Sequence, residues 1–379
     1  MQERIHFGAG GETRTLMMLP SQVFETCASA SSATPAGGII KLYQQEQISG
    51  LTNASLGVNI SFMTIKQIYD LAIEMGIKAD PRGTDGVKAF LARTKKEYQE
   101  LPAKKKQYFD PECLTNPYSD SRILYGNPQT QIKKLMAGID AGAAEVLLTD
   151  RLSQKGHKID LLISHHPSGH ALAALHEVLD IQIDMFAEAG VPENVAHALF
   201  DERKAVVQRR FKPLNHSQAV DAARLLEVPL LALHTVWDNM GHNFMKQYLS
   251  KKHFRTAGEV LDYINELPEF MEATKGKMAP HIVAGAASTR AGKVVVGFTG
   301  GTNPSKELYI ELAKAGVGTL VEMHVAEEAV LELRKLHINV IDAGHMAADS
   351  IGANLFLDEI AKRGIEVLPC SGLIRIKRK

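Results

Sequence analysis

The clearest fold signal is the segment from Lys133 to His166, which reads KKLMAGIDAGAAEVLLTDRLSQKGHKIDLLISHH. Its first part predicts a buried strand over residues 133–140, and AAEVLLTDRLSQKG predicts a helix over residues 143–156. A second buried strand is predicted over residues 159–166, and Gly156 precedes it. Two such strands joined by a helix form a β-α-β unit, whose strands are parallel. We therefore expect an α/β fold.

The same pattern returns about 160 residues later. KVVVGFTGG predicts a strand over residues 293–301, NPSKELYIELAKAG a helix over residues 303–316, and VGTLVEMH a strand over residues 317–324. Between the two units, PLLALH predicts a further buried strand that ends at His234. The repeat predicts two related β-α-β-containing halves with mixed or parallel sheets.

The chain of 379 residues is long enough for more than one domain. We predict a first α/β half over residues 120–250 and a second over residues 251–379. A helical extension is predicted over residues 63–119, where TIKQIYDLAIEMGIKA has helical periodicity. Residues 1–62 are rich in Gly, Ser, Ala and Thr and show no sustained period, so they are predicted to be a disordered tail or a non-native extension that precedes a natural start at Met63.

Composition excludes several classes of function. Lys and Arg together number 43, as do Asp and Glu, so the net charge is zero and a nucleic-acid partner is not favoured. The longest apolar runs, such as residues 228–233, are too short to cross a bilayer. The three cysteines, Cys27, Cys113 and Cys370, are too far apart in sequence for a local metal knuckle, and their number argues against a disulfide framework. A cytoplasmic protein without a membrane partner is expected.

Histidines gather where buried strands end. The motif ISHHPSGH places His165 and His166 after one strand, and parallel sheets bind ligands at the carboxyl ends of their strands. HTVWDN places Asp238 four residues after His234, and GHMAADS repeats that spacing for imidazole and carboxylate. A single pair of this kind is more often a surface contact on a helix. Three such constellations at strand ends favour a metal site, and the third favours a second metal over a mononuclear zinc deacetylase.

ISHHP, LHTVWDNMGHN and VIDAGHMAADSIGANLFLDE, in that order, resemble the Nif-three-like dinuclear metal family, also called GTP cyclohydrolase I type 2 homologues. The opening stretch DSRILYGNPQTQIKKLMAGIDAG also resembles that family. The resemblance covers about residues 120–360. It implies a Nif-three-like α/β fold, a toroidal homohexamer built as a trimer of dimers, and two divalent metal ions.

When the family's metal ligands are assigned to the matching positions, the resemblance implies that His166 and Asp238 would bind one metal. His165 and His345 would bind the other. Asp349 would bridge the two ions, where the family usually has glutamate, and His234 would lie beside them as a proton shuttle and catalytic group. Met346 replaces a usual tyrosine, and VEMH replaces a glycine-acid turn. Glu322 or His324 in that turn would then be either an outer contact of the site or, in the more ordinary interpretation, a polar strand end. His170, His176 and His242 are interpreted as solvent-facing, capping or ambiguous.

Imidazoles and carboxylates together suit Zn, Fe, Mn or Co. Two such cations lower the pKa of a water held between them, which is the chemistry of hydrolysis. Two functions follow: a GTP cyclohydrolase type 2-like hydrolase of a small, nucleotide or heterocyclic molecule, or a non-catalytic metal-binding regulatory protein. The turn FTGGTNPSKE predicts a helix capped by Asn303 with Pro304 in its first turn. It is either an anion site or, in the simpler interpretation, a tight turn.

Overall fold

The computed structural model describes residues 62–378. The predicted extension over residues 1–62 lies, apart from its last residue, outside the described residues. The strands are β1 (Met63–Thr64), β2 (Ser121–Tyr125), β3 (Gln131–Ile132), β4 (Lys134–Gly138), β5 (Leu161–Ser164), β6 (Leu230–Leu233), β7 (His281–Ala284), β8 (Lys293–Gly297), β9 (Val317–Glu322), β10 (Asn339–Asp342) and β11 (Glu366–Cys370).

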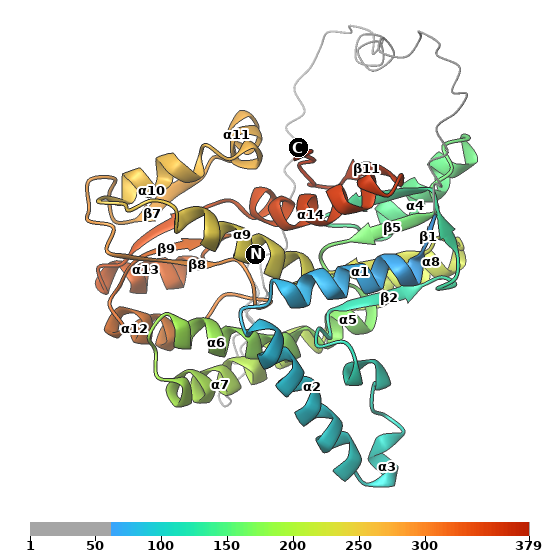
Figure 1. The fold of residues 1–379 in the computed structure, drawn as a ribbon, viewed down its shortest axis with the longest axis horizontal. Helices are drawn as coiled ribbons and strands as arrows, with labels where there is room; N and C mark the ends of the chain where they lie inside the picture. Colours follow the sequence, from blue (N-terminus) through green and yellow to red (C-terminus); the bar gives the residue numbers. More distant parts are fainter. Residues whose placement is uncertain (1–61, 379) are drawn as a thin grey trace, which may run out of the picture. The chain divides into compact units, whose positions relative to one another are not determined.

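Helices cover these strands, as Figure 1 shows. They are α1 (Ile65–Lys78), α2 (Gly83–Glu100), α3 (Ala103–Lys106), α4 (Ala143–Gln154), α5 (Gly169–Ala173), α6 (Ile181–Glu188), α7 (Glu193–Phe211), α8 (Gln218–Leu225), α9 (Thr235–Leu249), α10 (Ala257–Ile264), α11 (Pro268–Lys275), α12 (Lys306–Lys314), α13 (Glu327–Lys335) and α14 (His345–Lys362). Two short 3₁₀ helices are η2 (Pro111–Leu114) and η3 (Leu175–Asp180).

Two open sheets carry the fold, and β1 and β3 form a small ribbon beside them. The first sheet has the order β11-β4-β5-β6-β2, in which only β2 is antiparallel to its neighbour. The second has the order β7-β10-β9-β8, with β7 antiparallel. Both predicted β-α-β units form, as β4-α4-β5 and β8-α12-β9, each with parallel strands. The predicted mixed α/β fold is therefore confirmed.

The division into halves at residues 250 and 251 stays a prediction. The last strand, β11, pairs with β4 and so lies in the first sheet. The segment of residues 63–119 forms β1, α1, α2, α3 and η2, and α1 packs on the first sheet together with α14.

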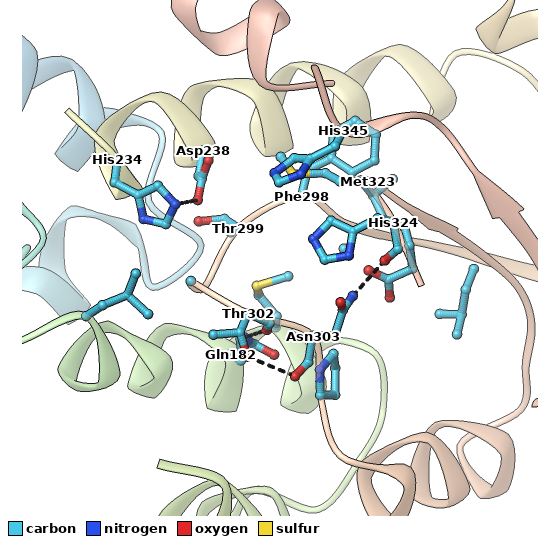
Figure 2. Close-up of a pocket in the computed structure, with 18 of the residues that line it drawn as sticks. Gln182, His234, Asp238, Phe298, Thr299, Thr302, Asn303, Met323, His324 and His345 are labelled. Atoms are coloured by element: carbon cyan, nitrogen blue, oxygen red, sulfur yellow. Dashed lines mark hydrogen bonds and ion pairs between the residues drawn. The ribbon is translucent and has the colours of Figure 1, made fainter. Parts of the chain in front are cut away.

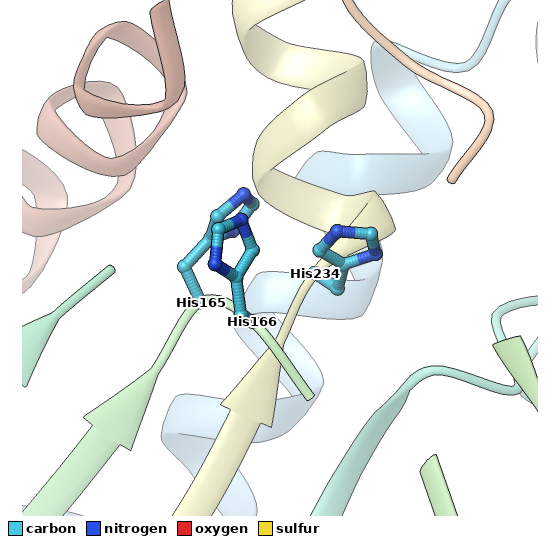
Figure 3. A group of neighbouring side chains, drawn as sticks. All are labelled: His165, His166 and His234. Carbon is cyan, nitrogen blue, oxygen red and sulfur yellow. The ribbon is translucent and has the colours of Figure 1, made fainter. Parts of the chain in front are cut away.

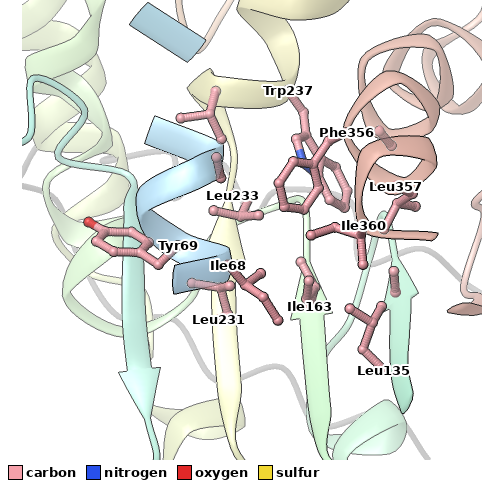
Figure 4. Close-up of a cluster of buried hydrophobic side chains, with 14 of the residues drawn as sticks. Ile68, Tyr69, Leu135, Ile163, Leu231, Leu233, Trp237, Phe356, Leu357 and Ile360 are labelled. Atoms are coloured by element: carbon pink, nitrogen blue, oxygen red, sulfur yellow. The ribbon is translucent and has the colours of Figure 1, made fainter. Parts of the chain in front are cut away.

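The first sheet is buried on both faces, which explains its continuous apolar strands. Successive side chains of a strand point to opposite faces. On β5, Ile163 therefore joins the core under α1, α9 and α14, whereas Leu162 joins the core under α4 and α8. Figure 4 shows the first of these cores, in which Ile68 of α1 lies beside Leu231 of β6 and Phe356 of α14 lies beside Trp237 of α9.

Helices α9 and α14 cross at a pair of glycines, Gly241 and Gly352. A Cβ atom placed on Gly352 would collide with the backbone carbonyl oxygen of Trp237 and would lie 3.0 Å from the amide nitrogen of Gly241. The two backbones are therefore in direct contact, which only glycine permits at this position. Because α9 follows the first sheet and α14 follows the second, this contact joins the two sheets.

Replacing Gly352 with Ala tests the crossing. The new methyl group must push α14 away from α9, so we expect a loss of about 1–3 kcal/mol in the free energy of unfolding, although alanine has the higher helix propensity. Denaturant unfolding measures this loss. Ala361→Ser, at an exposed position on the same helix, is the control, and an equal effect of both substitutions would contradict the close contact.

Candidate metal centre

The candidate site lies where the first sheet meets the first turns of α9 and α14. His165 and His166 follow β5, and His234 follows β6 and immediately precedes α9. Figure 3 shows these three imidazoles side by side at the ends of the two strands. Asp238 lies in the first turn of α9. Gly344, with a φ of 87°, turns the chain from β10 into α14, which brings His345 and Asp349 to the site.

The donor atoms of these side chains converge. The Nε2 atom of His165 lies 3.2 Å from Asp238 Oδ1 and 3.6 Å from Asp349 Oδ2. The Nε2 atoms of His166 and His345 lie 3.3 Å apart. Asp349 Oδ2 lies 3.4 Å from the first of these nitrogens and 3.2 Å from the second. A single carboxylate thus faces three imidazoles.

A second ring of contacts orients the imidazoles. The Nδ1 atom of His166 lies 2.6 Å from Asp140 Oδ1, and that of His234 lies 2.7 Å from Asp120 Oδ2. The Nδ1 atom of His165 lies 3.1 Å from the carbonyl oxygen of Leu233. These oxygens only accept hydrogen bonds, so each Nδ1 must donate. In the neutral ring the Nε2 atom then presents a lone pair to the site, which is the usual arrangement of metal-bound histidine.

Several of these atoms have no hydrogen-bond partner within the described residues. They are His165 Nε2 and both carboxylate oxygens of Asp349, whose side chain is fully buried. Buried polar atoms without partners are costly, and facing lone pairs repel. A bound cation would remove both costs. Three groups could hold one: His165 with Asp238 and Asp349, His166 with His345 and Asp349, and His165 with His166 and His234.

The electrostatics favour this use. Burial disfavours charge on Asp349, but His165 and His166 outweigh burial and hold its pKa well below the usual range. Burial lowers the pKa of His345 to about 4, with His166 adding to the effect and Asp349 opposing it. The ring of His345 is therefore neutral at pH 7 and has a lone pair to offer. For His166, the contact with Asp140 outweighs burial and raises the pKa, so a cation would compete with a proton there.

The structure brings all six residues of the sequence prediction together. The distances favour a different pairing from the one that the resemblance implied, since His165 lies with Asp238 and His166 with His345. His324, an alternative outer contact, lies with its ring centroid 4.6 Å from that of His345.

Sequence analysis missed the two carboxylates that orient the histidines. Asp140 follows β4 just as His165 follows β5, so its place after a buried strand was a usable signal. Asp120 precedes the antiparallel β2 and lies fully buried beside His234 and Thr235, a contact between residues 114 positions apart. The predicted cap at Asn303 is wrong. Helix α12 begins at Lys306 with Ser305 as its N-cap, because the Asn303 amide instead donates to the carbonyl oxygen of His324.

A cavity of about 300 Å³ opens beside the histidines. Figure 2 shows His234, Asp238 and His345 around one part of it, and Asn303, Gln182 and Thr302 around another. The floor is formed by β8 and the glycine-rich turn after it, which includes Phe298. The glycine-rich turn therefore lines the cavity. The site is therefore a buried donor cluster with a small-molecule cavity next to it.

The chain is similar to several proteins of known structure. A NIF3 superfamily protein from Sphaerobacter thermophilus matches with 27% sequence identity and a TM-score of 0.63, over 83% of this chain and all of that chain. Reduced HcgD from Methanocaldococcus jannaschii matches with 13% identity and a TM-score of 0.44, over 69% of this chain and 93% of that chain. A Bacillus cereus protein related to NIF3 matches with 10% identity and a TM-score of 0.41, over 81% and 96%. No family model and no curated protein sequence matches the chain.

Among the described helices, none combines the length and the apolar character that crossing a membrane requires.

Removing one orienting carboxylate should weaken metal binding without removing a ligand. Asp140→Asn replaces the carboxylate that accepts from His166, and we expect a loss of about 10–100-fold in metal affinity. Asp120→Asn should act in the same direction through His234 if that ring binds a cation. Competition with a chromophoric chelator measures the affinity. Asp150→Asn, on the outer part of α4, is the control, and unchanged affinity in Asp140→Asn would contradict the orienting role.

Proposed function

We propose that this chain, which belongs to the NIF3 superfamily, is a metal-dependent hydrolase of a small molecule that holds two divalent cations. The observation that carries the proposal is the position of Asp349, which belongs to two of the three donor groups. In this arrangement, His165 and Asp238 would hold one cation, His166 and His345 would hold the other, and Asp349 would contribute to both. The mixture of imidazole and carboxylate suits Zn, Fe, Mn or Co.

The two sides of the cluster differ in access. The side chains of His165 and Asp349 are buried, whereas that of His345 is 35% exposed and that of His166 is 25% exposed. The cavity also reaches His166 and His345. His166, His345 and Asp238 line the cavity and are the donors that a substrate can reach, whereas His165 and Asp349 do not line it.

Bound cations would lower the pKa of a water molecule and polarise the group under attack. The residues of the chain supply the rest. His234 lines the cavity, and its Nδ1 donates to Asp120, so its Nε2 is free to accept a proton from the attacking water. Asp120, which also accepts from the Thr235 hydroxyl at 2.6 Å, then stabilises the charged ring. His234 is accordingly the proposed general base.

The residues that line the cavity favour a small, uncharged substrate rather than a nucleotide. Among the described residues that line it, none is Lys or Arg, so these residues offer no Lys or Arg side chain to a phosphate chain. The family name implies GTP, but these walls favour the heterocyclic alternative. A toroidal hexamer in the cytoplasm completes the proposal.

Two substitutions separate a ligand from a base. Asp349→Ala should reduce the metal content of the full chain, purified without chelators, from two equivalents to one or none by elemental analysis. His234→Ala should keep two equivalents and lose about 10²–10⁴-fold in turnover, assayed with lactams, cyclic imides and phosphoesters. His197→Ala, an exposed histidine of α7, should change neither. Two equivalents without turnover on any substrate would instead favour a non-catalytic metal-binding protein.

The assembly has its own test. If the chain forms a hexamer, light scattering after size-exclusion chromatography should give six times the chain mass of 41.5 kDa. A monomer or an isolated dimer at micromolar concentration would contradict this part of the proposal.

A further inference from the structure

One carboxyl group of the cavity takes no part in the metal cluster. Glu322 is the last residue of β9, its side chain is 4% exposed, and it lines the cavity. Its carboxyl group makes no hydrogen bond and no ion pair with the residues that the structure describes. A Cβ atom on Gly297 of the neighbouring β8 would collide with this carboxyl group, so the glycine is what leaves room for it.

Three neutral polar side chains of this wall already use their donors. The Gln182 amide donates at 2.7 Å to the carbonyl oxygens of both Gly300 and Thr302, which holds the glycine-rich turn. The Asn303 amide donates to the carbonyl oxygen of His324. The Thr299 hydroxyl donates at 2.6 Å to Asn239 Oδ1. These contacts shape the cavity, whereas the Glu322 carboxyl group has no such partner among the described residues.

The surroundings of Glu322 favour its neutral form. Burial is the larger cause and Asp342 on the adjacent β10 is the second, and together they raise the pKa of Glu322 to about 8. The other titratable groups near it are Tyr309 of α12, whose hydroxyl is buried without a hydrogen-bond partner, and His324. No cationic side chain of the cavity wall opposes this effect. At neutral pH the carboxyl group therefore has one O–H donor beside one carbonyl acceptor.

A donor and an acceptor on one planar group match a ligand that presents an acceptor and a donor in the same plane. A ring –NH–C(=O)– edge has this pattern, because a lactam fixes its N–H and C=O on the same side. The two groups then form a ring closed by two hydrogen bonds. A buried group that is satisfied only by the correct ligand also gives strong discrimination, since an analogue without the N–H leaves it unpaired.

We propose that Glu322 is the specificity residue of this cavity and binds the lactam edge of a small heterocyclic substrate. The assignment deepens the proposed hydrolase and rests on it for the identity of the ligand as a substrate. Phe298 and Met323 provide apolar walls for the ring. The volume of about 300 Å³ is at the lower limit of small-molecule sites.

The test compares two probes on the full chain. They are 2-piperidone, which has the lactam N–H, and 1-methyl-2-piperidone, which lacks it. Ligand-observed NMR titrations at pH 6.5 should give at least tenfold tighter binding of 2-piperidone by the wild type. Glu322→Gln, which keeps a neutral donor and acceptor, should retain this preference, and Glu322→Met, which fills the same space without them, should abolish it.

A pH series keeps the test informative if Glu322→Met does not fold. Ionisation of Glu322 removes its donor, so wild-type affinity for 2-piperidone should fall as the pH rises from 7 to 9. The affinity of Glu322→Gln should stay constant over that range. Equal affinities for the two probes in the wild type would overturn the assignment. Affinity that rises with pH would also overturn it, because a cationic group would then be the better ligand.

This design distinguishes a failure of the proposed lactam subsite from a failure of the proposed hydrolase activity. The probe preference is measured on both zinc-loaded and chelator-treated protein, and the preference should be present in both. If the proposed hydrolase is wrong, no lactam is hydrolysed by the metal-loaded chain while the probe preference remains. If the subsite is wrong, hydrolysis continues in Glu322→Met at the wild-type rate.

Discussion

The backbone contact between α9 and α14 is the constraint on which the site depends. Each helix starts where a strand of a different sheet ends, and each contributes donors from its first turns, Asp238 from α9 and His345 with Asp349 from α14. The distances among these donors are therefore fixed by how closely the helices cross. Gly352 allows a separation that a side chain at this position would prevent, because its Cβ atom would collide with the carbonyl oxygen of Trp237. The metal site assembled from two sheets therefore depends on the absence of a side chain at Gly352.

Two buried carboxyl groups in this region have opposite electrostatic surroundings. Asp349 faces imidazoles, which outweigh burial and keep it ionised, while Glu322 faces Asp342 and stays protonated near neutral pH. The first is suited to hold cations and the second to form neutral hydrogen bonds. Environments that separate the pKa values of two acids commonly mark different chemical roles. Of the two, only Glu322 lines the cavity, whereas Asp349 is buried beside His166 and His345, which do line it.

Local signals were enough to predict the β-α-β units and the histidines, because buried parallel strands such as LLIS and LLAL leave long apolar runs and the next residues mark the sheet edge. Contacts between distant residues were not accessible in this way. Asp120 meets His234 only through the pairing of β2 with β6. β11 pairs with β4, although all the strands of the second sheet lie between them in the sequence. β11 is short and contains Pro369, which weakens any strand signal. In α6 and α7, apolar and polar residues are not separated clearly enough at helical spacing for these helices to have been predicted.

The aspartate at position 349 also follows from the helix crossing. The resemblance implies glutamate there, and aspartate is shorter by one methylene group, so on an unchanged backbone its oxygens would fall short of the histidines. Asp349 nevertheless lies within 3.6 Å of the Nε2 atoms of His165, His166 and His345. Gly352, one turn further along α14, is the residue that lets this helix approach α9 most closely. The close approach of α14 to α9 at Gly352 thus accompanies an Asp349 carboxylate that faces all three imidazoles.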